Sequence, residues 1–84
     1  MLALLQSIPD FKEPDERSAW IKEHAQHFTC SYRKRTVIVH TEHPSLHEAR
    51  RAAWFLTHAV NGSVMIYAVY GPHDSWLETV KPPT

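Results

Sequence analysis

The amino-acid sequence predicts a small single domain of the α/β (α+β) class, with two helices on one face of a three- or four-stranded mixed sheet. A chain of 84 residues is long enough for one domain with one core. Its hydrophobic content of 43% and charged content of 21% are typical of globular proteins. Segments with helical and strand patterns alternate in the order α-β-α-β-β, which favours helices packed on a sheet.

The N-terminal part predicts an arm followed by a helix. Residues 1–9 are expected to form an apolar arm or a short helix, because large aliphatic residues recur there at a spacing of three. A longer helix is predicted from Pro14 to His27. Proline suits a first helical turn, and the acidic residues that follow it complement the helix dipole.

The next segment predicts one strand and suggests a second. Residues 36–41 contain three consecutive β-branched residues, which is typical of a buried strand. Residues 29–32 can form a further short strand, and Arg33, Lys34 and Arg35 would then form the turn between the two.

The second helix has clear signals at both ends. Ser45 and Glu48 have the spacing of a capping box, with Ser45 as the N-cap. Asn61 and Gly62 provide the stop. The expected core face of this helix, bordered by Ala52, consists of Leu46, Ala49, Ala53, Leu56 and Val60.

The C-terminal part predicts a hairpin. Residues 64–70 are apolar at both alternating sets of positions, which indicates a central strand covered on both faces. Residues 71–74 form a turn, and residues 75–80 pair back as the last strand. The strands on either side of the second helix are expected to run parallel, joined by a right-handed crossover. Residues 81–84 contain two prolines and are expected to fray.

Charge and cysteine content bear on partners and compartment. The formal net charge is zero, which is unlike a strongly basic nucleic-acid-binding chain. The single cysteine, Cys30, cannot form an internal disulfide and favours a reducing, cytoplasmic location. No apolar run is long enough for a membrane span, and the N-terminal segment lacks the basic start of a signal peptide.

Seven histidines raise the question of a metal site. His24, His27 and Cys30 lie close together in the sequence, but the cysteine has no partner cysteine and paired ligands from a second element are missing. His24 and His40 occur in apolar patterns, where a buried neutral imidazole is expected. Since no nucleophile–base signature or phosphate-binding glycine loop occurs either, the sequence predicts no metal, no cofactor and no catalytic residue.

An alternative interpretation is a small nucleic-acid-binding module. Aromatic residues beside cations can stack on bases while the cations contact phosphates. The candidate residues for this function are Tyr32, Arg33, Lys34, Arg35, Arg50 and Arg51. The alternative is that these residues have no binding function and belong to a solvent-exposed turn and to the outer face of a helix.

The far side of the second helix carries the most informative pattern. At 100° per residue, a cluster forms opposite the core face, with Phe55 at its border. The candidate partner-binding residues are His47, Arg51, Trp54, Phe55 and His58. Trp54 either packs internally against the first helix, near Trp20, or anchors a protein contact, since Trp and Arg are common anchors of interfaces.

The face of the sheet that points away from the helices also needs a cover. Because residues 64–70 are apolar on both sides, either the N-terminal segment or a second copy of the chain is expected there. The sequence thus favours a non-enzymatic protein-interaction module that binds a protein partner or forms a homodimer. Small chains with few motifs are common among phage and mobile-element accessory proteins that bind and modulate or inhibit host factors, and the narrower prediction rests on that association alone.

Overall fold

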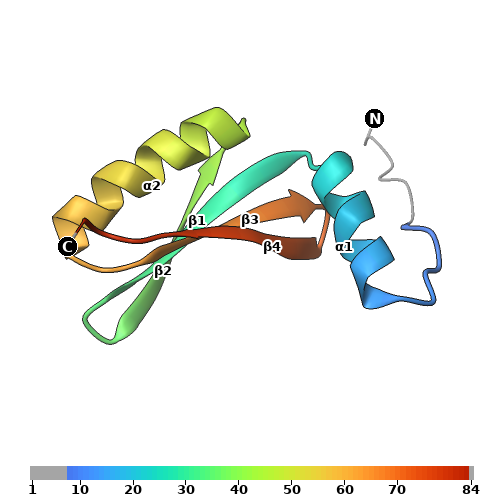
Figure 1. The fold of residues 1–84 in the computed structure, drawn as a ribbon, viewed down its shortest axis with the longest axis horizontal. Coiled ribbons are helices and arrows are strands. Elements are labelled where there is room, and N and C mark those ends of the chain that lie inside the picture. Colours follow the sequence, from blue (N-terminus) through green and yellow to red (C-terminus); the bar gives the residue numbers. More distant parts are fainter. Residues whose placement is uncertain (1–7, 84) are drawn as a thin grey trace, which may run out of the picture.

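The computed structural model describes residues 8–83, so most of the expected N-terminal arm and the last residue of the tail lie outside the described residues. Two helices and four strands follow one another in the order α-β-β-α-β-β (Figure 1). The elements are α1 (Pro14–Glu23), β1 (His27–Lys34), β2 (Val37–His43), α2 (Leu46–Val60), β3 (Val64–Tyr70) and β4 (His73–Val80). The predicted α+β class is confirmed.

The four strands form one sheet in the order β2-β1-β3-β4. Every neighbouring pair is antiparallel, so the prediction of a mixed sheet is wrong. β2 and β3 do run in the same direction, as the crossover through α2 requires. They are not neighbours, because β1 lies between them and pairs antiparallel with both.

β1 is longer than the short strand expected, and it shortens α1. The helix ends at Glu23 rather than His27, with the His24 N–H donating to the carbonyl of Trp20 (3.0 Å). His27 instead pairs with Val69 of β3. A residue that satisfies a sheet cannot also continue a helix, so the ladder with β3 fixes the boundary.

The β1–β2 connection is tighter than predicted. Lys34 pairs with Val37, which leaves only Arg35 and Thr36 between the strands. Arg35 has a φ of 59°, a conformation that most non-glycine residues avoid. Two-residue hairpin turns need such a positive φ to match the twist of the strands.

Both predicted ends of α2 are confirmed. The Ser45 hydroxyl accepts a hydrogen bond from the Glu48 N–H (3.1 Å), as an N-cap does. Asn61 ends the helix in the left-handed conformation, with φ 50° and ψ 47°. The core face also follows the prediction, with Ala49 and Ala53 fully buried, although the buried Thr57 was not expected there.

Both helices pack on one face of the sheet, as predicted. Val64 and Ile66 of β3 lie in one core cluster with Ala49 and Ala53 of α2. The next residues on the same face of β3, Ala68 and Tyr70, form a second cluster with Ile21 of α1.

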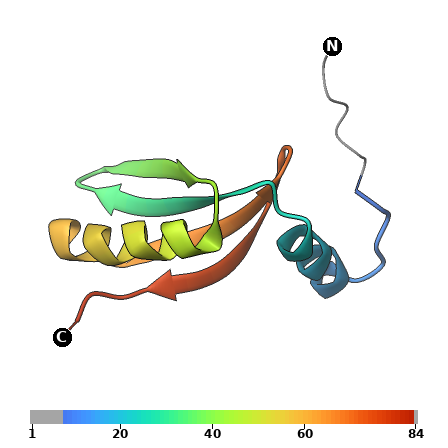
Figure 2. The same cartoon turned by 90° about the horizontal axis from the view of Figure 1, so that it is seen from above.

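The two helices therefore share this face by covering successive parts of it. Figure 2 shows α2 lying along the strands, with α1 beyond the end of α2. Within residues 8–83, no helix is long and apolar enough to cross a membrane.

Candidate functional site

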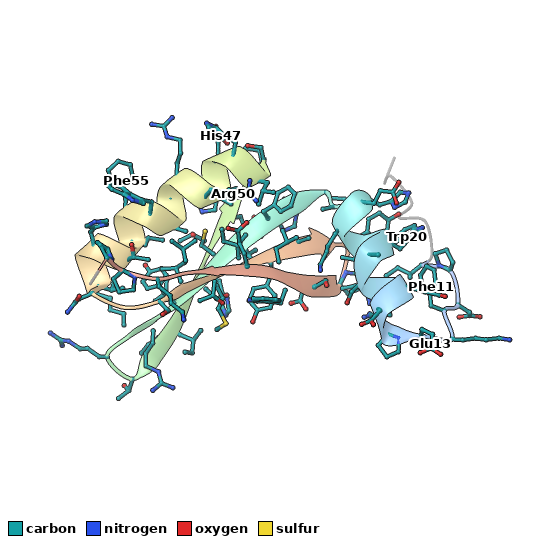
Figure 3. The ribbon with its side chains drawn as sticks, viewed as in Figure 1. Phe11, Glu13, Trp20, His47, Arg50 and Phe55 are labelled. Atoms are coloured by element: carbon teal, nitrogen blue, oxygen red, sulfur yellow. The ribbon has the colours of Figure 1, made fainter. Side chains whose placement is uncertain are left out.

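The outer side of α2 carries an exposed aromatic surface, here called the α2 outer surface. It consists of His47, Arg51, Trp54, Phe55 and His58, all of which are exposed. Trp54 is 55% exposed and Phe55 is 62% exposed. Figure 3 shows His47 and Phe55 pointing away from the sheet. The structure thus brings the five predicted partner-binding residues together on one surface.

The rings of this surface support one another. The Trp54 and Phe55 rings meet edge to face with centroids 5.2 Å apart, and the His58 ring lies 4.3 Å from Trp54. His58 Nδ1 is 2.8 Å from the Trp54 carbonyl oxygen, which accepts only, so Nδ1 carries the proton. The Thr57 hydroxyl donates to the same carbonyl (2.7 Å). These contacts restrict the rings before any partner binds.

The internal interpretation of Trp54 is wrong, because α1 does not contact α2 in the described part of the chain. α1 packs on β3 and β4 instead. Its Trp20 packs edge to face on Tyr70 at 5.0 Å and stacks on His24 at 4.1 Å. Trp54 is therefore open to solvent in this structure.

The face of the sheet opposite the helices, here called the open sheet face, forms a second apolar surface. Its residues are His27, Thr29, Ser31 and Arg33 of β1, Ile38, His40 and Glu42 of β2, Met65, Tyr67 and Val69 of β3, and Asp74, Trp76 and Thr79 of β4. Ile38 is 50%, Met65 40% and Trp76 51% exposed. A depression of about 440 Å³ runs over this face above Thr29 and Ser31.

The sequence pointed to this face only through β3. The alternation in residues 64–70 predicted that Met65, Tyr67 and Val69 would need a cover. It did not identify Trp76, which shares the open face with Tyr67 because the two residues are paired across β3 and β4. The pairing of β4 with β3 shifts by one residue between Ile66 and Tyr67. The alternation of inward and outward residues in β4 is therefore interrupted, and its sequence does not show which residues face outward.

A serine–histidine pair lies on the open sheet face. The Ser31 hydroxyl and His40 Nδ1 are 2.6 Å apart, a distance at which a histidine can activate a serine nucleophile. Ser31 is only 5% exposed and lies in a strand paired on both sides. An acyl-transfer site also needs free backbone N–H groups for an oxyanion, and the amides of an internal strand are engaged in the ladder. The geometry fits a cross-strand hydrogen bond.

The histidines are distributed over the surface. His24 and His40 are exposed, so the prediction that they are buried is wrong. His24 lies after the end of α1, where it stacks on Trp20, and His40 lies on the uncovered face of the sheet. His27 Nε2 is 3.7 Å from Glu42 Oε1. Among residues 8–83, no three His, Cys, Asp or Glu side chains are grouped as metal ligands would be.

Cys30 belongs to the core. Its side chain is fully buried between β1 and α2, and its thiol donates a hydrogen bond to the Ala49 carbonyl (3.2 Å). Burial raises the pKa of the Cys30 thiol, and a hydrogen bond with the Thr41 side chain opposes part of that rise. A buried neutral thiol is a poor nucleophile and a poor metal ligand.

The candidate nucleic-acid residues do not form one surface. Arg33, Lys34 and Arg35 are exposed at the β1–β2 turn. Tyr32 is partly buried and packs against the core cluster, so less of its ring is open for stacking on a base. Arg50 is paired with Glu78 of β4, with both Nε and Nη2 2.8 Å from Oε1.

No protein-family model, curated protein or solved structure matches this chain. Its function is therefore inferred from the chemistry of its two apolar surfaces. One is a convex aromatic ridge on a capped helix, and the other is a broad sheet face.

Proposed function

We propose that this chain is a non-enzymatic protein-interaction module whose α2 outer surface binds a protein partner. The observation that carries the proposal is the adjacent exposure of Trp54 and Phe55 on one turn of α2, beside Arg51. Tryptophan and arginine are enriched among the residues that dominate binding energy. An exposed tryptophan beside an exposed phenylalanine is also a contiguous apolar patch of the kind that marks interaction sites.

The spacing of these residues indicates how a partner would engage the helix. His47, Arg51, Trp54 and His58 are three or four residues apart, so they lie along one side of α2. An amphipathic helix with such anchors fits a hydrophobic groove on its partner. An acidic group opposite Arg51 and a basic group opposite the exposed Glu48 at the edge of the surface would complement it.

Preorganisation supports the same proposal. Ser45 caps the start of α2 and Asn61 ends it in the left-handed conformation, so the helix has defined ends before binding. The Trp54 ring is held between Phe55 and His58. A surface that is ordered in the free protein loses less conformational entropy when it binds.

The narrower proposal concerns the kind of partner. We place the chain among accessory proteins of phages or mobile elements that bind and modulate or inhibit a host factor in the cytoplasm. What supports this is the small size of the domain and the scarcity of catalytic motifs. The nucleic-acid alternative has weaker support, because Tyr32 is partly buried against the core and Arg50 is paired with Glu78.

The test is partner capture with a matched pair of variants. Trp54→Ala removes the central ring of the α2 outer surface, and Trp76→Ala removes an equally exposed tryptophan from the open sheet face. We expect proteins captured from a lysate of the source organism by the native chain to be lost with Trp54→Ala and kept with Trp76→Ala. For a purified partner, Trp54→Ala should weaken binding by about 30-fold or more, equivalent to ~2 kcal/mol.

Circular dichroism provides the control, since both tryptophans are half-exposed and both variants should keep the native spectrum. A partner that binds native protein and Trp54→Ala equally well would refute the assignment of the α2 outer surface.

A further inference from the structure

The β3 and β4 part of the open sheet face is apolar, and the polar groups of its two aromatic rings already have partners. Met65, Tyr67 and Trp76 form the central apolar area, flanked by Ile38. The Trp76 indole N–H donates to the Thr79 hydroxyl (3.1 Å), and the Tyr67 hydroxyl points to the Met65 sulfur (3.7 Å).

The Ser31 hydroxyl on the same face hydrogen-bonds His40. Because these groups are satisfied within the chain, a second apolar surface can cover the centre without leaving them unpaired.

The two ends of this face carry opposite charges. Arg33 lies in the row next to the β1–β2 turn, where it pairs with Ile38. Glu42 pairs with Thr29 further along the strands, and Asp74 pairs with Val69 at the opposite end from Arg33. Along the strands the charge therefore changes from basic at Arg33 to acidic at Glu42 and Asp74, with His27 Nε2 3.7 Å from the Glu42 carboxylate.

From this arrangement we infer that the open sheet face is the interface of a homodimer, in which two sheets stack face to face with their strands antiparallel. The two-fold axis of this dimer lies between the two sheets and runs perpendicular to the strands. The strands of the second copy therefore run in the opposite direction. Arg33 of each copy then faces the acidic end of the other, and the symmetry forms each contact twice. An axis along the strands would instead place β2 over β4, with Glu42 near Asp74, and like charges would repel.

The α2 outer surface has no comparable separation of charge along its length. The exposed Glu48 at its edge is three residues from Arg51, so an acid and a base occur side by side there. On the open sheet face the basic and acidic groups lie toward opposite ends, and this separation favours a second copy in the antiparallel arrangement.

The size of the face indicates a reversible dimer. Four strands spaced ~4.8 Å apart, each seven residues long at ~3.3 Å per residue, cover roughly 440 Å². Two such faces bury about 900 Å² if the extra area of protruding side chains is left out, which is below the ~1,200 Å² lower bound of stable interfaces and in the range of weak, reversible ones. Dimerisation should therefore depend on concentration across the micromolar range.

Sedimentation velocity over that concentration range tests the inference. The native chain should shift from monomer to dimer as concentration rises. Trp76→Glu should weaken dimerisation by about 100-fold, because a charge in the apolar centre would be buried without a partner. Phe55→Glu, an equally exposed aromatic on the α2 outer surface, should leave dimerisation unchanged. Met65→Glu provides a second variant on the open face should Trp76→Glu lose its native circular dichroism spectrum.

A charge reversal tests the antiparallel arrangement. Arg33→Glu and Glu42→Arg should each weaken the dimer, and the double variant should restore it, because the reversed face is again complementary to itself. A native chain that stays monomeric throughout, whether its face is covered by its own N-terminal segment or by another protein, would overturn the inference. So would a dimer that Phe55→Glu abolishes and Trp76→Glu does not. Neither result would affect partner binding through Trp54, so the two proposals fail separately.

Discussion

At the scale of single residues, the burial of Cys30 has a consequence for stability at alkaline pH. The thiol is fully buried, and burial raises its pKa above the value it has in the unfolded chain. Deprotonation therefore favours the unfolded state. The contribution of the neutral thiol to stability is complete below the unfolded pKa of about 8.5 and declines as pH rises from there toward the folded pKa.

Comparison with Cys30→Ala isolates this contribution. At neutral pH the variant should be less stable by ~1–2 kcal/mol, because it loses the sulfur and the hydrogen bond to Ala49. The difference in unfolding free energy should shrink as pH rises above ~8.5, as measured by urea denaturation. A difference that stays constant to pH 10 would contradict the raised pKa. The folded protein should also react slowly with thiol reagents.

The sequence pattern predicted correctly whether some residues are exposed and was wrong for others, and the difference has a physical reason. The outward position of Trp54 followed from helical geometry, because α2 is regular and its core face is continuous. His24 and His40 were expected to be buried because apolar residues surround them in the sequence. Sequence neighbours say little about burial after a helix ends or on an uncovered sheet face, and those are the places that these two residues occupy.

At the scale of elements, α2 depends on its N-cap. Ser45→Ala removes the acceptor for the Glu48 N–H and should cost ~1 kcal/mol of unfolding free energy. Ser63→Ala, at an exposed position before β3, is the matched control and should change stability by less than ~0.5 kcal/mol. The denaturation midpoints of both variants measure the effect. Equal midpoints for native protein and Ser45→Ala would mean that the cap contributes nothing.

The elements with strong local signals were the ones that the sequence placed well. α2 has a cap at each end, and β3 is apolar throughout, so their bounds follow from short-range chemistry. The end of α1 and the length of β1 depend on pairing between His27 and Val69, which are far apart in the sequence. The helical sequence pattern continues past Glu23, but it contains no information about the distant strand that pairs with the same backbone.

At the scale of the whole molecule, the layers separate the two surfaces. Both helices cover one side of the sheet, so the α2 outer surface and the open sheet face point in opposite directions. The sequence predicted the single helical layer. It did not predict the strand order, because a crossover helix allows β2 and β3 either to be neighbours or to leave room for a third strand between them.

That strand order also has a consequence for how fast the chain folds. β1 pairs with β2, and β3 pairs with β4, through two short turns, so each hairpin can form locally. The sheet is complete only when β1 meets β3, and that step closes a long loop containing β2 and α2. Loop closure costs entropy before any contact is gained, so the pairing of β1 with β3 should limit the folding rate.

Two matched substitutions would show this order of events in stopped-flow kinetics. Ile66→Val alters β3 where it pairs with Cys30 of β1, and Ile21→Val alters α1, with both isoleucines fully buried. Each should cost ~1 kcal/mol of stability. Ile66→Val should mainly slow folding, whereas Ile21→Val should mainly speed unfolding, because α1 packs on a sheet that has already assembled. The pairing of β1 with β3 would then be the kinetic nucleus, and α1 would be the last of the described elements to join the fold.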